Sequence, residues 1–335
     1  MSDERIQLGH GGGGRLSRAL VDREILPRFG DGPLRGLPDA ARLPALAGPI
    51  VFTTDSYVVQ PLRFPGGNIG HLAVHGTVND LAVSGARPLW LSLALILEEG
   101  LPWAVFCEVL DAVRDAAAAC DVQVVTGDTK VVPRGQCDGM YVNTAGIGEA
   151  LPDLVLDPAR LRPGDAILAS GTLGDHGMAV MGAREGIAVA GGPESDTAPV
   201  HRLVLALADL SPAVRFMRDP TRGGAAAVLN EMVGGRPVGI ELDEAALPFS
   251  PGARAVAEAL GIDLLHVASE GRVLLACAPE AADGILERWR ARPEGRGATR
   301  LGHVTAEAGR VALRTAVGGR RLVDVPQGEL LPRIC

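Results

Sequence analysis

The sequence has few aromatic residues, few cysteines and no long uncharged apolar run. Aromatic residues make up 3% of the 335 residues, and the 5 cysteines include no C-x-x-C pair. An odd number of cysteines without that spacing argues against a disulfide framework and against a cysteine zinc site. Four of the cysteines are expected to be inert packing residues. The fifth, Cys335, differs because it is the last residue of the chain.

Signals for membranes and for nucleic acids are also missing. No stretch of about 18 apolar residues is free of charge, so no membrane-spanning helix is expected. The opening MSDERIQLGH lacks the apolar core of a signal peptide, and the cytoplasm is the expected location. A net charge of −8 excludes the basic surface of a general nucleic-acid-binding protein. An anionic ligand would need locally placed cations, glycine amides or a metal.

The common nucleotide-binding signatures are absent as well. The chain has no G-x-x-x-x-G-K-[ST] motif and neither the H-R-D nor the D-F-G motif of protein kinases. The glycine run at residues 11–14 does not follow a predicted strand, which rules out a Rossmann interpretation. Any nucleotide site must therefore be of another kind.

The composition that is present indicates a chain of two domains. The length and the 47% hydrophobic content allow a large core. The 44 glycines and 24 prolines have no collagen-like period and indicate many tight turns. Apolar runs alternate with helical periods, which is typical of an α+β or α/β chain. We expect four segments: a mobile glycine-rich N-terminal arm at 1–45, an N-terminal domain at 46–155, a C-terminal α/β domain at 156–324 and a tail at 325–335.

Local periodicity predicts individual elements within both domains. Apolar residues recurring at three and four predict helices, and short apolar runs between turn residues predict strands. The expected helices are 16–25, 69–84, 103–120, 178–185, 200–210 and 223–233. The expected strands are 50–54, 89–97, 122–126, 140–147, 166–169, 238–242 and 273–277.

One acidic turn joins the first predicted strand to the next helix. Thr54 and Asp55 end the strand, and Gly66 and Gly67 come just before the helix. A carboxylate at a strand end, facing a glycine-opened helix N-terminus, can hold Mg²⁺ while the helix amides face a phosphate. An Asx turn followed by an ordinary loop explains the same residues.

Polar residues interrupt the otherwise apolar helix at 69–84. His75 and Asn79 lie on one face at i and i+4, and Asp80 follows directly. Burying such groups without partners would cost roughly 1 to 3 kcal/mol each, so something must satisfy them. A hydrogen-bonded structural pair and a metal site remain equal alternatives.

Asp128 and Lys130 follow a buried strand within Thr126-Gly-Asp-Thr-Lys130. The acid could bind a metal and the lysine a phosphate oxygen, which is the pairing that phosphoryl transfer requires. A surface ion pair at a strand end is the alternative.

Two more acidic turns lie in the second half of the chain. Asp219, Arg222 and Gly223 precede a predicted helix, and Glu270 precedes a predicted strand. Each turn is a weak signal alone. Five acid-plus-glycine turns spread over both halves jointly indicate a polyphosphate held through several Mg²⁺ ions.

The chain ends in Val325-Pro-Gln-Gly-Glu-Leu-Leu-Pro-Arg-Ile-Cys335. Two prolines and a glycine prevent a regular helix, and eleven extended residues could reach roughly 35 Å. A thiol on such a tether can visit a second protein's active site and return to its own. A frayed terminus with an accidental cysteine is the alternative.

These motifs, in this order, closely resemble the HypE family of hydrogenase maturation factors. The resemblance rests on TTDSYVV, FPGGNIG, HGTVNDLAVSGA, GDTKV, DPTRGG, ASEG and the terminal PRIC, and it runs from about residue 6 to Cys335. One departure is Gly12, where relatives often carry a serine. That departure puts in doubt a side-chain phosphate contact there, but not the glycine loop itself.

The resemblance implies an α+β fold of the PurM-like, aminoimidazole-ribotide-synthetase-like type, with two domains and a flexible C-terminal tail. In such proteins the N-terminal halves of two subunits form a β-barrel in a homodimer, and ATP lies in the groove between the domains. On this view residues 46–155 form the ATP-binding and dimerisation domain.

The resemblance also implies an activity, an ATP-dependent carbamoyl dehydratase. A carbamoyl group is placed on the C-terminal cysteine by the carbamoyltransferase HypF and is dehydrated with ATP to a thiocyanate. The cyanide then passes to iron held by the HypC and HypD partners, on the way to [NiFe] hydrogenase.

Roles for individual residues follow from the same resemblance. Glu270 and His75 are both candidates for proton removal or for orienting the tail, and Arg333 could anchor the tail to a carboxylate. The expected catalytic residues are Cys335, Lys130, Glu270 and His75. The expected ATP-binding residues are Gly11, Gly13, Gly14, Thr54, Asp55, Gly66, Gly67, Asp128, Thr129, Lys130, Arg222 and Gly223. The expected Mg²⁺ ligands are Asp55, Asn79, Asp80, Asp128 and Asp219.

Two other functions stay open. One is a different synthetase of the same superfamily, making selenophosphate or aminoimidazole ribotide. Against it, a selenophosphate synthetase typically has a reactive cysteine near its N-terminal glycine loop, whereas the first cysteine here is Cys107. The other is a non-catalytic scaffold that only presents a carbamoylated tail, for which a phosphate site would serve no purpose.

Overall fold

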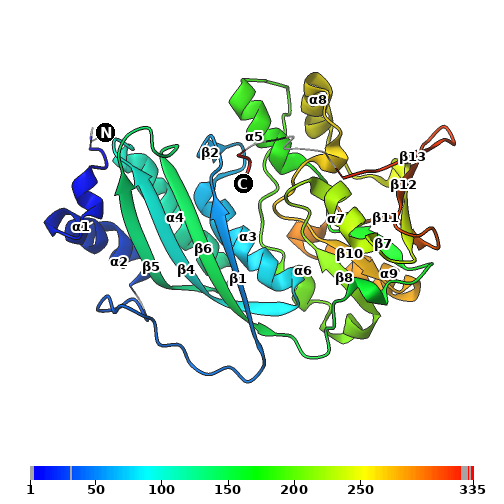
Figure 1. Ribbon diagram of the computed structural model, residues 1–335, viewed down its shortest axis with the longest axis horizontal. Coiled ribbons are helices and arrows are strands. Elements are labelled where there is room, and N and C mark those ends of the chain that lie inside the picture. The colour runs from blue at the N-terminus through cyan, green and yellow to red at the C-terminus, as the bar shows by residue number, and fades with distance from the viewer. Residues whose placement is uncertain (1–3, 31, 326–330, 332) are drawn as a thin grey trace.

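The computed structural model describes residues 4–30, 32–325, 331 and 333–335. Two sheet-based domains lie side by side, with helix α3 (Ile69–Val83) between them and the C-terminus near their junction (Figure 1). A two-domain α+β fold was expected, and the structure confirms it.

The N-terminal domain is built on a four-stranded sheet. Its strand order is β1-β6-β4-β5, so β1 and β5 form the two edges. The pairs are antiparallel except β4 with β5, which are parallel and joined by helix α4. The elements are β1 (Ile50–Tyr57), β4 (Ala86–Glu98), α4 (Trp103–Ala119), β5 (Gln123–Val132) and β6 (Met140–Ala150), and a two-stranded hairpin, β2 (Arg63–Phe64) and β3 (Gly67–Asn68), precedes α3.

Only one face of this sheet is packed against helices. Helix α3 contacts β1, β6 and β4 on that face. Side chains that alternate to the other face stay open, and they include Ile50 at 66% exposure, Phe52 at 64% and Ile96 at 41%. An antiparallel sheet with one wet face normally carries polar residues there, so this apolar face is unusual.

The C-terminal domain contains a seven-stranded mixed sheet in the order β13-β12-β9-β11-β7-β10-β8. Its strands are β7 (Ala166–Ala169), β8 (Val214–Arg218), β9 (Gly239–Asp243), β10 (Leu274–Cys277), β11 (Thr299–Thr305), β12 (Val311–Arg314) and β13 (Arg320–Leu322). Its helices are α5 (Asp175–Glu185), α6 (His201–Leu205), α7 (Gly224–Val233), α8 (Pro251–Leu260) and α9 (Ala282–Arg290).

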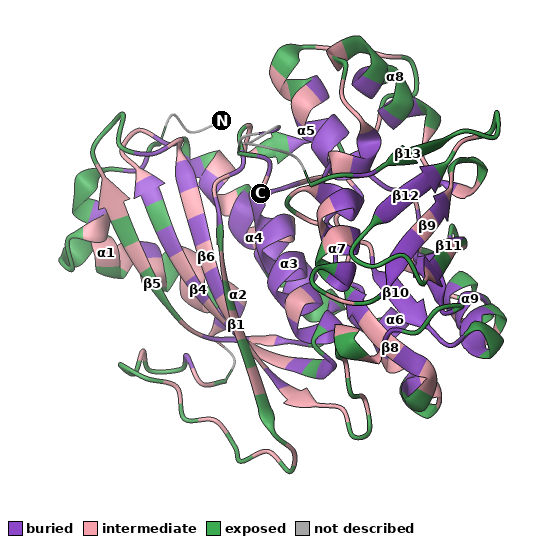
Figure 2. Cartoon of the chain, turned by 45° about the vertical axis from the view of Figure 1, so that its right-hand side comes forward, coloured by how far each residue is buried: buried purple, intermediate pink, exposed green. Residues whose placement is uncertain are grey.

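The sequence patterns predicted the central elements better than the peripheral ones. The helix expected at 200–210 ends at Leu205, and a separate 3-10 segment at Ala208–Ala213 follows it. Helices α8 and α9 and strands β11 to β13 were not predicted. Both helices have one buried and one exposed side, as Figure 2 shows.

The N-terminal segment packs on α4 and β5. Ile6 exchanges backbone hydrogen bonds with Leu101 and Gly100, and helical residues run from Arg15 to Phe29. Arg28 on this segment is ion-paired with Asp111 at 2.8 Å. The predicted mobility of residues 1–45 stays a prediction.

Helix α3 connects the two domains. It is buried along nearly its whole length, as expected for a helix covered on both sides (Figure 2). The fully buried Asn79 amide donates to the carbonyls of Ala198 and Glu270, at 3.0 and 2.9 Å, and accepts from the Val200 N–H at 2.8 Å. Asn79 thereby ties the N-terminal domain to two segments of the C-terminal domain.

Replacing Asn79 by alanine should destabilise the fold strongly. The change leaves buried backbone groups of Ala198, Val200 and Glu270 without partners, and each costs about 1–3 kcal/mol. We expect the free energy of unfolding, measured by urea denaturation, to fall by roughly 3 kcal/mol or more. The control is Asn230→Ala, because half-buried Asn230 bonds only within its own domain. Equal losses in both variants would contradict this role.

Candidate active site

Four acidic side chains from different elements meet at the junction of the domains. Asp55 lies on β1, Asp80 on α3, Asp219 just after β8, and Glu270 in the turn before β10. Asp219 and Glu270 are buried, with 6% and 2% of their surface exposed. The structure thus brings together four acids that are far apart in the sequence.

Burial and the charges of neighbouring acids raise the pKa values of Asp80, Asp219 and Glu270. Burial, followed by the Asp55 charge, raises the pKa of Asp80 to about 6. Burial, followed by the Asp80 charge, raises the pKa of Asp219 to about 7. Burial and then the charge of Asp219 raise the pKa of Glu270 well above its usual range. Such crowded carboxylates need protons or bound cations to coexist.

The backbone of Glu270 is held on both sides. Its carbonyl accepts from Asn79, and its N–H donates to Asp196 Oδ1 at 2.9 Å. Its carboxyl atom Oε1, by contrast, is buried without a hydrogen-bond partner among the described residues. A buried unpaired oxygen on a fixed backbone is suited to accept a proton or contact a ligand.

The C-terminal residue lies beside this cluster. The carbonyl of Cys335 accepts from the Val58 N–H at 3.2 Å, and that of Arg333 accepts from the Gln60 N–H at 3.1 Å. The tail therefore runs along the chain just beyond β1. Arg333 also pairs with Asp138 at 2.5 Å, which confirms the expectation that it anchors the tail to a carboxylate.

The Cys335 thiol is protonated in this position. Burial, helped by the nearby Glu270 carboxylate, raises its pKa to about 12, against the opposing effect of Arg222. A protonated thiol is a poor nucleophile. The docked position therefore suits a reaction on a group already attached to the sulfur.

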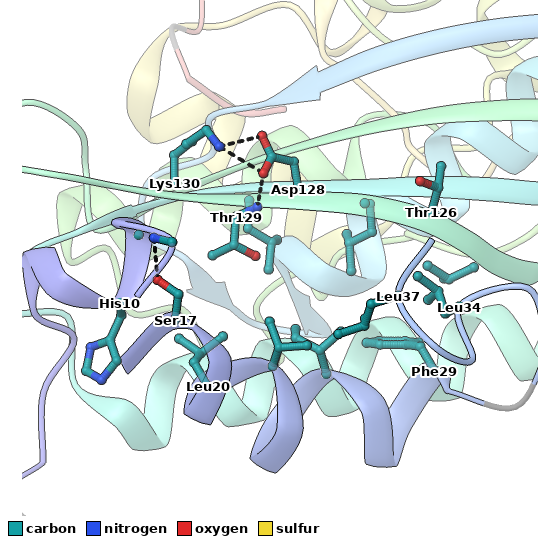
Figure 3. Close-up of a pocket in the computed structure, with 18 residues that line it drawn as sticks. His10, Ser17, Leu20, Phe29, Leu34, Leu37, Thr126, Asp128, Thr129 and Lys130 are labelled. Atoms are coloured by element: carbon teal, nitrogen blue, oxygen red, sulfur yellow. Dashed lines mark hydrogen bonds and ion pairs between the residues drawn. The ribbon is translucent and has the colours of Figure 1, made fainter. Parts of the chain in front are cut away.

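A second candidate site lies at the other edge of the N-terminal sheet. A cavity of about 300 Å³ opens between the N-terminal segment and strands β4 and β5 (Figure 3). Asp128, Thr129 and Lys130 line it together with the loop glycines Gly11 and Gly13. Its remaining wall is largely apolar and includes Leu20, Val21, Ile25, Phe29, Leu34, Leu37, Leu93, Leu95 and Val124.

Backbone geometry explains two of the loop glycines. A Cβ on Gly11 would lie 2.4 Å from the Val131 nitrogen, so only glycine allows the loop this close to β5. Gly13 has a φ of +76°, which favours glycine, and its N–H donates to Ser17. Gly14 caps the N-terminus of α1 (Arg15–Leu20).

The two candidate sites are separate within one chain. Asp128 and Lys130 are exposed and ion-paired with each other at 3.0 Å. They lie on edge strand β5, whereas Asp55 lies on edge strand β1, and three strand spacings correspond to about 14 Å. One chain alone does not bring Lys130 to the carboxylate cluster.

The other predicted nucleotide-binding residues have visible structural roles. Gly66 and Gly67 belong to the β2–β3 hairpin, and a Cβ on Gly66 would press on Ser195. Thr54 is exposed and donates to the carbonyl of Thr144. Gly223 caps helix α7. Contact of these residues with a nucleotide stays a prediction.

His75 is buried away from the cluster's charges. Its Nδ1 lies 3.1 Å from Thr197 Oγ1. Burial, followed by the charges of His71 and His201, lowers its pKa to about 3. The imidazole is therefore neutral near pH 7 and a weak base.

The donor set of the cluster fits Mg²⁺ bound together with phosphate. Among the described residues, no three His, Cys, Asp or Glu side chains form a metal site by themselves. Mg²⁺ usually takes only one or two carboxylates and completes its shell with phosphates and water. Asp55, Asp80 and Asp219 offer such carboxylates at the junction of the domains. Asn79 was also expected to bind Mg²⁺, but both the nitrogen and the oxygen of its side-chain amide are hydrogen-bonded to the C-terminal domain.

Several residues of the site were not found from the sequence. Asp196 fixes the Glu270 backbone, and fully buried His176 binds the tail. Tyr57 donates to Asp55 at 3.2 Å. Tyr57 lies within the TTDSYVV motif and could have been noticed, whereas Asp196 and His176 lie in stretches without a distinctive pattern.

Comparisons with known proteins agree with this architecture. Residues 39–150 match the family model of the AIR synthase related protein N-terminal domain, and residues 162–314 match that of the C-terminal domain. The fold and site thus define a two-domain protein of the AIR synthase-related class. No helix of the described chain is long and apolar enough to cross a membrane.

Individual relatives narrow the class further. Carbamoyl dehydratase HypE of Rhodobacter capsulatus is 47% identical, over 100% of this chain and 99% of the relative. A structure of HypE in complex with ATP matches with a TM-score of 0.93 and 44% identity, over 98% of this chain and 99% of that one. A HypE–HypF complex matches with a TM-score of 0.80 and 41% identity, over 92% and 100%. The chain belongs to the HypE family of carbamoyl dehydratases.

The low pKa of His75 predicts a measurable effect of pH on stability. Between pH 7 and pH 5 the unfolded state gains a proton on His75 while the folded state does not, so acid favours unfolding. The free energy of unfolding of the wild type should fall, relative to His75→Gln, by about 2 kcal/mol over this range. A constant difference between the two proteins in urea denaturation at both pH values would contradict the assignment.

Proposed function

We propose that this chain dehydrates an S-carbamoyl group on its own Cys335 to a thiocyanate, using ATP. The observation that carries the proposal is the docked tail, which places Cys335 beside Arg222 and the buried carboxyl of Glu270. The relatives named carbamoyl dehydratase support it. The product would supply cyanide ligands for the iron of [NiFe] hydrogenase.

The chemistry explains why ATP is needed. The carbamoyl oxygen is a poor leaving group until it carries a phosphoryl group. Transfer of the terminal phosphoryl group to that oxygen, followed by loss of both N–H protons and departure of phosphate, converts S–C(=O)–NH₂ into S–C≡N. The balance is one ATP consumed, with ADP and phosphate released and the carbamoyl oxygen leaving in the phosphate.

Glu270 is the better candidate for the proton acceptor. Its unpaired carboxyl oxygen lies next to the tail, and its raised pKa makes the carboxylate a strong base. His75 has a pKa of about 3 and no tail residue among its charged neighbours. Of the two candidates that the sequence left equal, these surroundings favour Glu270.

Asp55, Asp80 and Asp219 would hold Mg²⁺ together with the nucleotide phosphates. The ion would offset phosphate charge during transfer. Arg222, whose pKa is raised first by the Cys335 thiol, would face the reacting end of the tail. In this proposal these residues orient the carbamoyl group toward the phosphate.

A homodimer would complete the nucleotide site. The apolar cavity at β5 has room for a nucleoside, and Asp128, Thr129, Lys130 and the glycine loop stand at its polar side. The carboxylates lie on the opposite edge of the sheet. Two sheets joined through their open apolar faces into a barrel would bring Lys130 of one copy toward the carboxylates of the other.

The remaining partners follow from the chemistry. Burial raises the pKa of the docked Cys335 thiol to about 12, which makes it a poor nucleophile and favours carbamoylation with the tail outside the site. HypF is the proposed donor, in line with the similar HypE–HypF complex. A HypC–HypD complex carrying iron is the proposed acceptor, in the cytoplasm, where ATP is available.

The mass of the C-terminus tests the function directly. After incubation with carbamoyltransferase, carbamoyl phosphate and ATP, Cys335 should carry a carbamoyl adduct that loses the mass of one water when MgATP is present. Cys335→Ala should carry neither adduct yet still bind ATP. An adduct that never loses water indicates a passive carrier, and no adduct favours a small-molecule synthetase.

Substitutions separate the two candidate bases. Glu270→Gln should slow dehydration of carbamoylated protein at least 100-fold, because general base catalysis contributes 10²–10⁴-fold. His75→Gln should stay within a few-fold of the wild type. Single-turnover rates at saturating ATP measure both, and the reverse order would identify His75 as the base.

A charged residue on the open face of the N-terminal sheet tests whether two subunits share the nucleotide site. Phe52→Asp places a carboxylate on the proposed barrel surface, so the protein should become monomeric in light scattering. Its ATP turnover should fall below a tenth of the wild-type rate. Val317→Asp is the matched control, because Val317 is 94% exposed in the other domain. A dimeric, active Phe52→Asp protein would contradict the shared site.

A further inference from the structure

The main chain of the tail is held from both domains. The Val58 N–H of the N-terminal domain donates to the Cys335 carbonyl. His176, on α5 of the C-terminal domain, has its Nε2 2.5 Å from the Ile334 carbonyl. The proposed reaction gives His176 no chemical step, although its side chain is fully buried.

Hydrogen bonding defines the state of this imidazole. A carbonyl only accepts, so Nε2 must carry the proton. Nδ1 is then the acceptor, and the Ser195 hydroxyl, 2.8 Å away, donates to it. The Thr197 N–H donates in turn to the Ser195 oxygen at 3.2 Å. The relay from Thr197 through Ser195 thus fixes the tautomer that binds the tail.

Packing also fixes the plane of the ring. The Phe64 ring meets His176 edge to face, with centroids 5.4 Å apart and planes at 89°. Phe64 belongs to the β2–β3 hairpin, whose Pro65 carbonyl accepts from the Ser195 N–H at 2.8 Å. The same hairpin therefore supports both the imidazole and its serine partner.

The bond to Ile334 controls the residue that follows. The Ile334 carbonyl and the Cys335 nitrogen and Cα share one rigid peptide plane. A hydrogen bond that fixes this carbonyl therefore fixes where the Cys335 side chain starts. The Val58 bond holds the carbonyl beyond Cys335, so the residue is clamped on both sides.

We propose that His176, with Ser195, is a positioning residue that sets the depth and orientation of the docked tail and so aligns the group on Cys335 with Glu270 and Arg222. The inference rests on the proposed function for its purpose, but the docking itself is measurable without ATP or a carbamoyl group. Because a main-chain carbonyl is recognised, the bond is the same whatever the sulfur carries.

Alkylation of Cys335 by iodoacetamide measures docking directly. A docked, protonated thiol reacts slowly, and an undocked thiol reacts faster. Cleavage after Glu329 releases residues 330–335 for mass spectrometry, which separates Cys335 from the other cysteines. His176→Leu, which lacks the donor, should react at least five-fold faster than the wild type. His176→Gln, which keeps an N–H donor, should stay within two-fold.

Two further variants show whether faster alkylation reflects undocking of the tail or a general loss of structure. His201→Leu removes another buried histidine, whose charged neighbours are Arg202, Asp121 and Glu294 rather than the tail, and should leave the rate unchanged. Ser195→Ala keeps the imidazole and removes its tautomer lock, and should raise the rate about two-fold. The proposal is wrong if folded His176→Leu is alkylated at the wild-type rate. If His176→Leu does not fold, the proposal is wrong if Ser195→Ala is alkylated at the wild-type rate.

Single-turnover dehydration provides the functional readout. His176→Leu should lower the rate constant at least ten-fold with the KM for ATP within two-fold, and His176→Gln should restore most of the rate. A change in the KM alone would overturn the positioning role. If the wild type shows no dehydration, the proposed function fails, while the alkylation result still decides whether His176 docks the tail.

Discussion

The arrangement depends on the repulsion among four neighbouring acidic side chains, of which Asp219 and Glu270 are buried. Burial and the charges of neighbouring acids, Asp55 among them, raise the pKa values of Asp80, Asp219 and Glu270. Such a cluster is stable only with protons or cations to offset its charge. The fold holds these carboxyl groups close together despite their repulsion, which makes cation binding, phosphate binding and proton transfer possible.

Rigid elements keep the cluster in place against that repulsion. Helix α3 is buried between the domains, and Asn79 on it joins segments around residues 198–200 and 270. The tail completes the site from outside, held mainly through its carbonyls. A fixed receptor and a main-chain-bound tail fit the proposed cycle, in which the thiol leaves to be carbamoylated and returns to the same place.

The sequence predicted the fold and much of the site for physical reasons. Asp55, Asp219 and Glu270 were found from acidic turns beside predicted strands and helices, and Asp80 from the polar residues that interrupt an apolar helix. The separation of Lys130 was not predictable, because edge positions depend on strand order, which local patterns do not determine. His176 was missed because a buried histidine on a short helix has no distinctive spacing, and its partner is a backbone carbonyl.

The destination of the carbamoyl oxygen tests the central claim most directly. Protein carrying an ¹⁸O-labelled carbamoyl group on Cys335 would be mixed with MgATP, and the released phosphate would be analysed by mass spectrometry. If phosphoryl transfer to that oxygen activates the group, one ¹⁸O atom appears in each phosphate as the thiocyanate forms. Thiocyanate formation with unlabelled phosphate, and the label in water, would contradict the account.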